Sequence, residues 1–311
     1  YFGPEGVSLG ANDENPKGFW ERRDVLDLDE ALLQAAGADW FRVTDFALAN
    51  IPPSTLASFR QEAAKLILVM DAHRPWVMKE PRQCLLFPLW RELLEVPVCI
   101  FVHRPPIQIA QSLQRRNGFP IPFGLALWER YTLDALKAMA GLPVIVVLHE
   151  DLMRDPIVLA RRLFKELRAV GVRGLRQPST QEILAFIEPK YFRHQGDEAL
   201  QLQFMNHRQQ QLDLHIRNDL KVLLSPGADL TISVGGQAQL SAYEHYLTQG
   251  QALQGVEQAL AESTALLNDR EHALAKLSRR LGQVEQEFLT QGQAMQTDEH
   301  ALDDSADLLN D

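Results

Sequence analysis

The residues best suited to chemistry lie in the segment FVHRPPIQIAQSLQRRNGFP, residues 101–120. An apolar run ends at Arg104, two prolines follow, and Ser112 comes eight residues after the arginine. Prolines favour the first turn of a helix, where free backbone amides and the helix dipole attract anions. A guanidinium adds a planar set of donors that fits phosphate oxygens, and a serine adds a neutral hydroxyl. The pattern predicts a phosphate site; the alternative is an ordinary ion pair at Arg104 and a buried small residue at Ser112.

Short apolar runs and amphipathic stretches alternate over the first 200 residues. The runs predict strands buried on both faces, at residues 66–70, 76–78, 98–102 and 144–148. The amphipathic stretches predict helices over residues 83–94, 107–116, 125–140 and 157–170. This alternation predicts an α/β domain with a mostly parallel sheet flanked by helices. Because ligands bind at the carboxyl ends of such strands, Lys79, Arg104 and His149 are expected near a site.

Composition excludes several classes of protein. The 311 residues are 46% hydrophobic and 23% charged, which permits a buried core rather than wholesale disorder. The net charge of -10 argues against a general nucleic-acid binder. No apolar run approaches the roughly 18 residues of a membrane helix. Two cysteines, Cys84 and Cys99, are too few for a disulfide-built secreted domain, so a reduced, cytoplasmic setting is expected.

Four segments together resemble a known enzyme family. An apolar run ending in Arg-x-Pro, with a serine eight residues on, resembles the 3′-phosphate motif of sulfotransferases that use PAPS (3′-phosphoadenosine 5′-phosphosulfate). Three further segments agree in order and spacing: NPKGFWERRD (15–24), WVMKEPRQCLLFPLW (76–90) and HEDLMRDP (149–156). The set covers about residues 1–200 and is similar to bacterial sulfotransferase domains that often accompany glycosyltransferase modules in cell-surface polysaccharide pathways. The resemblance implies a P-loop NTPase-like fold and sulfuryl transfer from PAPS to a hydroxyl, most plausibly on a carbohydrate.

The resemblance also implies roles for individual residues. Arg104 and Ser112 would hold the 3′-phosphate of the co-substrate. Lys79 would stabilise the leaving phosphate, and Glu21 would act as the base for the acceptor hydroxyl. A second basic contact to the 3′-phosphate is expected from two residues of the PKYFRH segment, Lys190 and Arg193. No metal is implied.

Simpler interpretations stand beside these roles. Lys79 could pair with Glu80, and Glu21 could pair with one of the two arginines that follow it. We expect Asp155 to cap the helix that Pro156 opens rather than to act in catalysis. An acceptor cleft could be lined by Arg115, Arg116, Asn117, Phe119, Trp128, Glu129 and Tyr131, although Trp128 and Tyr131 have the spacing of core residues.

One part of the family pattern does not occur in these residues. The phosphosulfate loop of the family, a strand followed by a sequence such as RSGTS, is absent from the 311 residues, as is GxxxxGK[ST]. In the family this loop precedes the segment that begins here at Tyr1. We therefore expect the natural protein to extend before Tyr1, and a nucleotide kinase is a weaker alternative because no Walker lysine is found.

The last third of the sequence has a different character. Residues 201–246 are interpreted as a helical and linker region whose loop is marked by Ser225-Pro226-Gly227 and by Gly235-Gly236, and residues 247–311 as a heptad-repeat helix. Residues 247–269 recur at 289–311 with 15 of 23 positions identical, an offset of six heptads, and we expect the chain to continue beyond the second copy. Self-association or a partner helix is expected here. The alternative function is a scaffold whose sulfotransferase-like body is impaired and whose coiled coil recruits partners.

Overall fold

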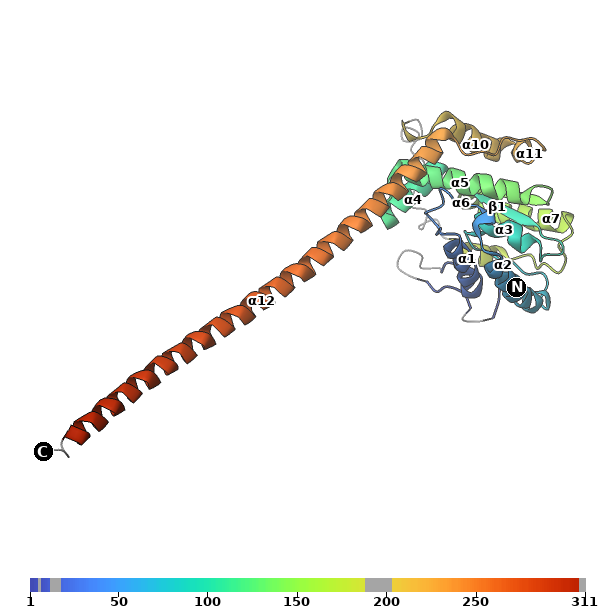
Figure 1. Cartoon of the computed structure of the whole chain (residues 1–311). Coiled ribbons are helices and arrows are strands. Elements are labelled where there is room, and N and C mark those ends of the chain that lie inside the picture. Colours follow the sequence, from blue (N-terminus) through green and yellow to red (C-terminus); the bar gives the residue numbers. More distant parts are fainter. Residues whose placement is uncertain (5–6, 12–17, 188–202, 308–311) are drawn as a thin grey trace. The chain divides into compact units, whose positions relative to one another are not determined.

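The chain is mostly helical and divides into two compact units. The structure is a computed structural model that describes residues 1–4, 7–11, 18–187 and 203–307, with side chains described up to residue 292. The first unit is Tyr1–His245 and the second is Tyr246–Asp311. Figure 1 shows the helices of the first unit around a small sheet. In the part of the chain that the structure describes, no helix is long and apolar enough to cross a membrane.

Two of the expected strands form the sheet. β1 (Cys99–His103) pairs in parallel with β2 (Val144–Leu148), and the register runs from Cys99 opposite Val144 to His103 opposite Leu148. The crossover between them contains α4 (Pro106–Asn117) and α5 (Ile121–Met139). This is the strand–helix–strand connection that parallel pairing requires. The prediction of a parallel sheet flanked by helices is therefore confirmed at this coarse level.

The other two expected strands are not strands. Residues 66–70 lie within α2 (Pro53–Asp71), where Leu68 and Val69 are 72% and 53% exposed while their neighbours are buried. That burial follows the period of a helix, which a five-residue apolar run cannot reveal. Residues 76–78 are extended but form no assigned strand; Val77 N donates to Tyr1 O at 2.9 Å and the Tyr1 amino group donates to Pro75 O at 2.8 Å.

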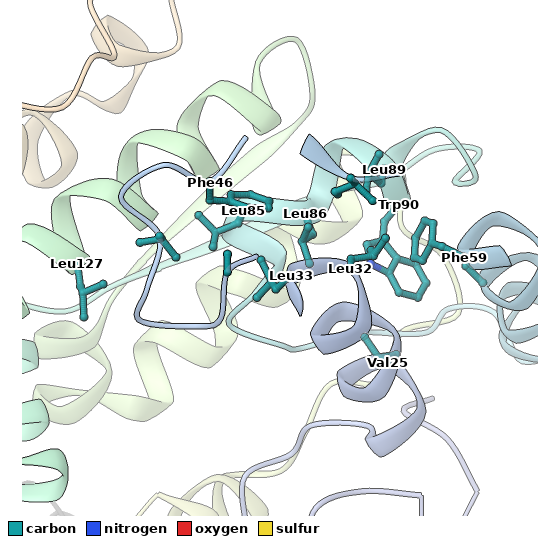
Figure 2. Packing of buried hydrophobic residues seen from close by; sticks show 14 of the residues in the cluster. Val25, Leu32, Leu33, Phe46, Phe59, Leu85, Leu86, Leu89, Trp90 and Leu127 are labelled. Atoms are coloured by element: carbon teal, nitrogen blue, oxygen red, sulfur yellow. The ribbon is translucent and has the colours of Figure 1, made fainter. Parts of the chain in front are cut away.

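The main core joins the first three helices. α1 (Arg23–Ala35), α2 and α3 (Gln83–Arg91) bury their apolar faces against one another and against the 3₁₀ turn η1 (Leu48–Asn50) and its flanking loop. Figure 2 shows Phe59 beside Trp90, whose rings meet edge-on with centroids 5.2 Å apart. Trp90 is fully buried, and its indole Nε1 donates to Asp29 at 2.7 Å, so its single polar atom has a partner.

Shorter helices follow β2. They are α6 (His149–Arg154), α7 (Pro156–Ala169), α8 (Thr180–Phe186), α10 (His207–Asn218) and α11 (Leu220–Leu223). Helices α6 and α7 lie against β2, and α10 and α11 pack with α5. The capping role expected of Asp155 is confirmed, because its carboxylate accepts from Val158 N at 3.0 Å and Pro156 is the first residue of α7. Leu212 and Ile216 of α10 pack with Trp128 and Leu136 of α5 in a second core cluster.

The last helix, α12 (Val234–Asp307), starts at a buried carboxylate. Glu129 of α5 is fully buried and accepts from Ser233 N at 2.6 Å, Ser233 Oγ at 2.9 Å and Gln209 Nε2 at 2.9 Å. A negative charge at this position also complements the dipole of α12. The expected loop is found at residues 225–227 but not at Gly235 and Gly236, since both of these glycines lie in the first turn of this helix. A glycine is needed at 236 because a Cβ there would collide with Glu129 Oε2.

Gly236→Ala should therefore destabilise the first unit by about 1–3 kcal/mol, the usual cost of overpacking a filled site. All five tryptophans lie in the first unit, so their fluorescence during urea unfolding measures this free energy directly. Gly250→Ala is the matched control in the same helix, because a Cβ there meets open space. It should leave the tryptophan transition unchanged. Equal midpoints for Gly236→Ala and the parent chain would contradict this account of the helix start.

Candidate functional site

The ends of the two paired strands bring two basic residues to one edge of the sheet. His103 is opposite Leu148, so the next residues, Arg104 and His149, lie at the same carboxyl edge. Burial lowers the pKa of His149, and the positive charge of Arg104 lowers it further. The two side chains are therefore close enough to interact. This edge is where a parallel sheet binds ligands.

Arg104 has a charge that no described acid balances. Its side chain is half-buried, and its Nε donates to the neutral Oε1 of Gln108 at 3.2 Å. Burial lowers the pKa of Arg104, and the nearby cation Arg115 lowers it further. Among the described residues no carboxylate forms an ion pair with Arg104. Since a partly buried charge is costly without a counter-charge, an anion bound here would stabilise the site.

Helix α4 supplies the rest of this candidate anion site. It begins at Pro106 with Pro105 as its N-cap, so its first amides follow directly on Arg104. Ser112 lies half-buried in the same helix, three residues before Arg115, and residues at this spacing share a helix face. Sequence reasoning assigned Arg115 to an acceptor cleft; the structure instead brings it within electrostatic range of Arg104. The position of Arg115, three residues after Ser112, was the sequence signal that could have placed Arg115 at the candidate anion site.

Glu21 and Lys79, the two residues expected to act in catalysis, form an ion pair. Lys79 Nζ donates to a carboxylate oxygen of Glu21 and, at 2.9 Å, to Phe19 O. The carboxylate is nearly buried, with Glu21 7% exposed, whereas the lysine side chain is about half exposed. Neither simpler pairing is found: Glu80 binds Arg82, and Arg22 binds Asp24. The described hydrogen bonds and ion pairs do not link this pair directly to Arg104.

Trp20 precedes this pair in an unusual backbone conformation. Its φ of 54° is the one positive value outside glycine among the described residues. Bulky residues adopt this region at a cost of about 1–3 kcal/mol and do so most often at functional sites. The indole ring is 48% exposed and lies edge-on to Phe2 and Phe186, at centroid distances of 6.2 and 5.6 Å. An exposed aromatic surface is therefore held next to Glu21.

Buried carboxyls support the segment that carries Lys79. Asp29 of α1 hydrogen-bonds to Glu80, and it also accepts from Gln83 Nε2 and Trp90 Nε1, both at 2.7 Å. Burial raises the pKa of Asp29 well above its ordinary value, and the neighbouring Glu80 raises it further. The pKa of Glu80 is also raised by burial, which outweighs the opposing charge of Arg82. The hydrogen bond between the two carboxyls requires a proton on one of them, and this contact fixes residue 80 next to the lysine.

A chain of charged groups fixes the other side of β1. His103 Nε2 lies 2.8 Å from Asp213 Oδ1 in α10. Arg217 then joins Asp213, at 3.0 Å, to Glu150 of α6, at 2.7 Å. This chain of contacts lets Glu150 help to position the residues at the end of β2.

Several other residues expected at the site lie in the core or outside the described residues. Lys190 and Arg193 lie outside the described residues. Trp128 and Phe119 are buried in the core, and Tyr131 donates to Trp40 O at 2.5 Å. Glu129 does not line a cleft, since it is the fully buried acceptor at the start of α12.

Neither cysteine is suited to act as a nucleophile. Both are free thiols, and burial raises the pKa of Cys84 to about 12 and that of Cys99 to about 11. Both thiols stay protonated at neutral pH, and the thiolate is the reactive form. Across the described ranges, no three or more histidine, cysteine or acidic side chains gather into a group that could hold a metal ion.

In comparisons with protein-family models, with curated protein sequences and with solved structures, nothing matches this chain.

The proton held by the Asp29–Glu80 pair makes the first unit sensitive to pH. Both pKa values are raised on folding, so the folded state holds a proton that the unfolded state releases above about pH 4. Stability should therefore fall as pH rises from there through the raised pKa values, with a slope of up to about 1.4 kcal/mol per pH unit for one proton.

Asp29→Asn should flatten that slope, because the amide is neutral at every pH. The measurement is the urea midpoint of tryptophan fluorescence at a series of pH values. Asp27→Asn, an exposed position of the same helix, should keep the slope of the parent chain. An unchanged slope in Asp29→Asn would show that this pair does not hold the proton.

Proposed function

We propose that the first unit is a PAPS-dependent sulfotransferase domain that transfers a sulfuryl group to a hydroxyl of a carbohydrate acceptor. The observation that carries the proposal is Arg104, a half-buried guanidinium at the end of β1 with no described acidic partner and with the start of α4 directly after it. The four sequence segments that resemble the family supply the assignment to PAPS rather than to another phosphate compound. The contacts around Arg104 supply the physical basis for anion binding.

The 3′-phosphate would bind at the carboxyl edge of the sheet. Arg104 would donate to its oxygens with the guanidinium nitrogens that Gln108 does not engage. The hydroxyl of Ser112 and the first amides of α4 would add neutral donors. Arg115 would add a second positive charge. A doubly charged phosphate would offset the mutual repulsion of the two arginines.

The Glu21–Lys79 pair would carry the transfer step. In this step the acceptor oxygen forms a bond to sulfur while the bond from sulfur to the bridging phosphate oxygen breaks. Glu21 would accept the proton of the acceptor hydroxyl. Lys79 Nζ would neutralise the charge that develops on the leaving phosphate. The existing ion pair supports these roles, since it keeps a proton acceptor and a cation within contact of each other.

Trp20 supports a carbohydrate as the acceptor. Its half-exposed ring adjoins Glu21 in sequence, and its strained backbone holds the ring in place beside Phe2 and Phe186. Ligand sites commonly combine such rigid aromatic faces with a few polar groups. The apolar face of a sugar could stack here while a hydroxyl approaches the carboxylate.

Arg104→Ala should weaken binding of adenosine 3′,5′-bisphosphate, the nucleotide product, about 10- to 100-fold, as expected for losing a charged hydrogen-bonding group. Titration calorimetry of the parent chain and the variant measures the change. Arg116→Ala is the matched control, because Arg116 binds Asn117 and stacks on Trp40 at 5.6 Å. Its affinity should stay within about twofold of the parent. Loss of affinity in both variants alike, or in neither, would contradict the site.

Glu21→Gln should reduce sulfuryl transfer at least about 100-fold, the usual contribution of a general base, and leave nucleotide binding intact. Transfer of radiolabelled sulfate from PAPS to a polysaccharide acceptor measures this, in the protein as it occurs with all its segments. Glu62→Gln, an exposed partner of Lys65, should keep full activity. Full activity in Glu21→Gln would remove this residue as the base.

The second candidate is a scaffold, favoured by the exposed leucine series of α12. In that case the folded parent chain should not bind the nucleotide at all, and the calorimetric titration separates the two functions.

A further inference from the structure

The second unit presents an apolar stripe that nothing in the described structure covers. Every residue from 251 to 292 in α12 is exposed. Leucines or a phenylalanine recur every seventh position along this stretch, at Leu253, Leu260, Leu267, Leu274, Leu281 and Phe288. Apolar residues at this spacing mark the a positions of a coiled coil.

A second apolar series is consecutive only in the middle of the helix. Three residues after each a position, the d positions are apolar at Val256, Leu277 and Val284 but polar at Ser263, Arg270 and Gln291. The complete part of the stripe consists of Leu274, Leu277, Leu281, Val284 and Phe288, which we call the central seam. Its side chains are 50% to 78% exposed. Such a seam becomes stable when the knobs of another helix fill it.

The helix has little stability of its own. Beyond its first turn the described helix contains glycines that each cost up to about 1 kcal/mol of helix stability relative to alanine. They are Gly250, Gly255, Gly282 and Gly292. Most helices in proteins are held by packing of one face rather than by propensity. The central seam supplies that face, and it therefore needs an occupant.

Charges beside the central seam select the occupant. Arg280 directly precedes Leu281 and occupies position g, and Glu285 follows it at position e. In a parallel, in-register pair, position g of one helix faces position e of the next heptad in the other. Arg280 of each copy would then face Glu285 of the other, giving two interhelical ion pairs. In its own helix, Arg280 has no acid three or four residues away.

Antiparallel pairing covers the central seam less completely. With Leu281 opposite Leu277, Phe288 would oppose Arg270, and Arg280 of one copy would face Arg280 of the other. With Leu281 opposite Val284, Arg280 would face Glu287, but Leu274 would oppose Gln291. A parallel slip of one heptad is also unfavourable, because Arg280 would face Ser278 or Gly292 and Arg270 would oppose Leu277. Only the parallel, in-register arrangement pairs all five apolar residues of the seam with one another, and polar residues opposite the seam disfavour the others.

We propose that the second unit forms a parallel, in-register coiled-coil dimer with a second copy of this chain, centred on residues 274–288. The two 23-residue repeats flank this seam and share its phase, but they lack its complete apolar series. The segment between the repeats therefore sets the register. This inference is independent of the proposed enzymatic function.

Sedimentation equilibrium of the full chain tests the charge pairing. The parent should be a dimer, and Arg280→Glu or Glu285→Arg alone should weaken it about tenfold, because each change turns two attractive pairs into two repulsive ones. The double variant, with both changes, should restore the affinity to within about threefold of the parent. A monomeric or trimeric parent, or a double variant no better than the single ones, would overturn the proposal.

Disulfide trapping tests the orientation. Leu281→Cys should form a covalent dimer under mild oxidation, since equal a positions meet in a parallel pair. Gln286→Cys is the matched control at the outer f position and should remain uncross-linked. No covalent dimer from Leu281→Cys, or equal trapping of both variants, would exclude the parallel arrangement. Circular dichroism of each variant checks that helix content is retained.

Discussion

The parallel pairing of β1 with β2 determines where the charged groups of the first unit lie. Because the two strands run in the same direction and in register, the residues that end them emerge together at one edge. Arg104 and His149 therefore interact, and the crossover helices must start from that edge as well. A sheet of only two strands has little stability alone, so α3, α5 and α7 must hold it. The helical layers thus position the candidate site through ten strand residues.

The buried charges of the first unit differ in how they are balanced. Glu129 is satisfied by Ser233 and Gln209, and Asp29 hydrogen-bonds to Glu80. These acids are structural, since every contact they make holds another element in place. Arg104 is different, because its described partner is a neutral amide and the charge that lowers its pKa belongs to a second cation, Arg115. The first unit balances the charges of those two acids, whereas the charge of Arg104 has no described counter-charge and so does not stabilise the fold. That contrast is the physical reason to regard Arg104 as a ligand-binding residue.

Local sequence patterns were sufficient to predict a helix or strand where the segment has a clear pattern of apolar residues. The helices α3, α4, α5 and α7 could be predicted because apolar residues recur in them at helical spacing. Both strands were located from continuous apolar runs, but the expected burial on both faces is wrong for β1, where Ile100 and Val102 are 37% and 59% exposed. Residues 66–70 misled because five apolar residues fit a strand or the end of a long helix equally well, and only the partner elements decide. Gly236 misled for a related reason: it serves close approach to Glu129, about 100 residues away, rather than a turn.

The residues of the candidate site also differ in how far the sequence alone could predict them. Arg104 and Ser112 could be singled out because they belong to one continuous segment. The Glu21–Lys79 pair joins residues 58 positions apart, and the Asp29–Glu80 pair joins two acids that no sequence rule would place together. Like charges brought into contact can be recognised only in three dimensions, since sequence reasoning assigns each acid to solvent or to a cation.

The two parts of α12 use different heptad positions of one helix. At its start, Leu240 and Tyr243 pack into the first unit, and Tyr243 stacks on Phe123 at 4.2 Å. Extending the heptad of Leu253 back by two repeats reaches residue 239, so Leu240 is one position out of phase with the central seam. One residue corresponds to about 100° around an α-helix. Leu240 and Tyr243 therefore do not occupy the heptad positions of the central seam. Docking within the chain and pairing between chains can therefore occur in the same helix without competing for the same side chains.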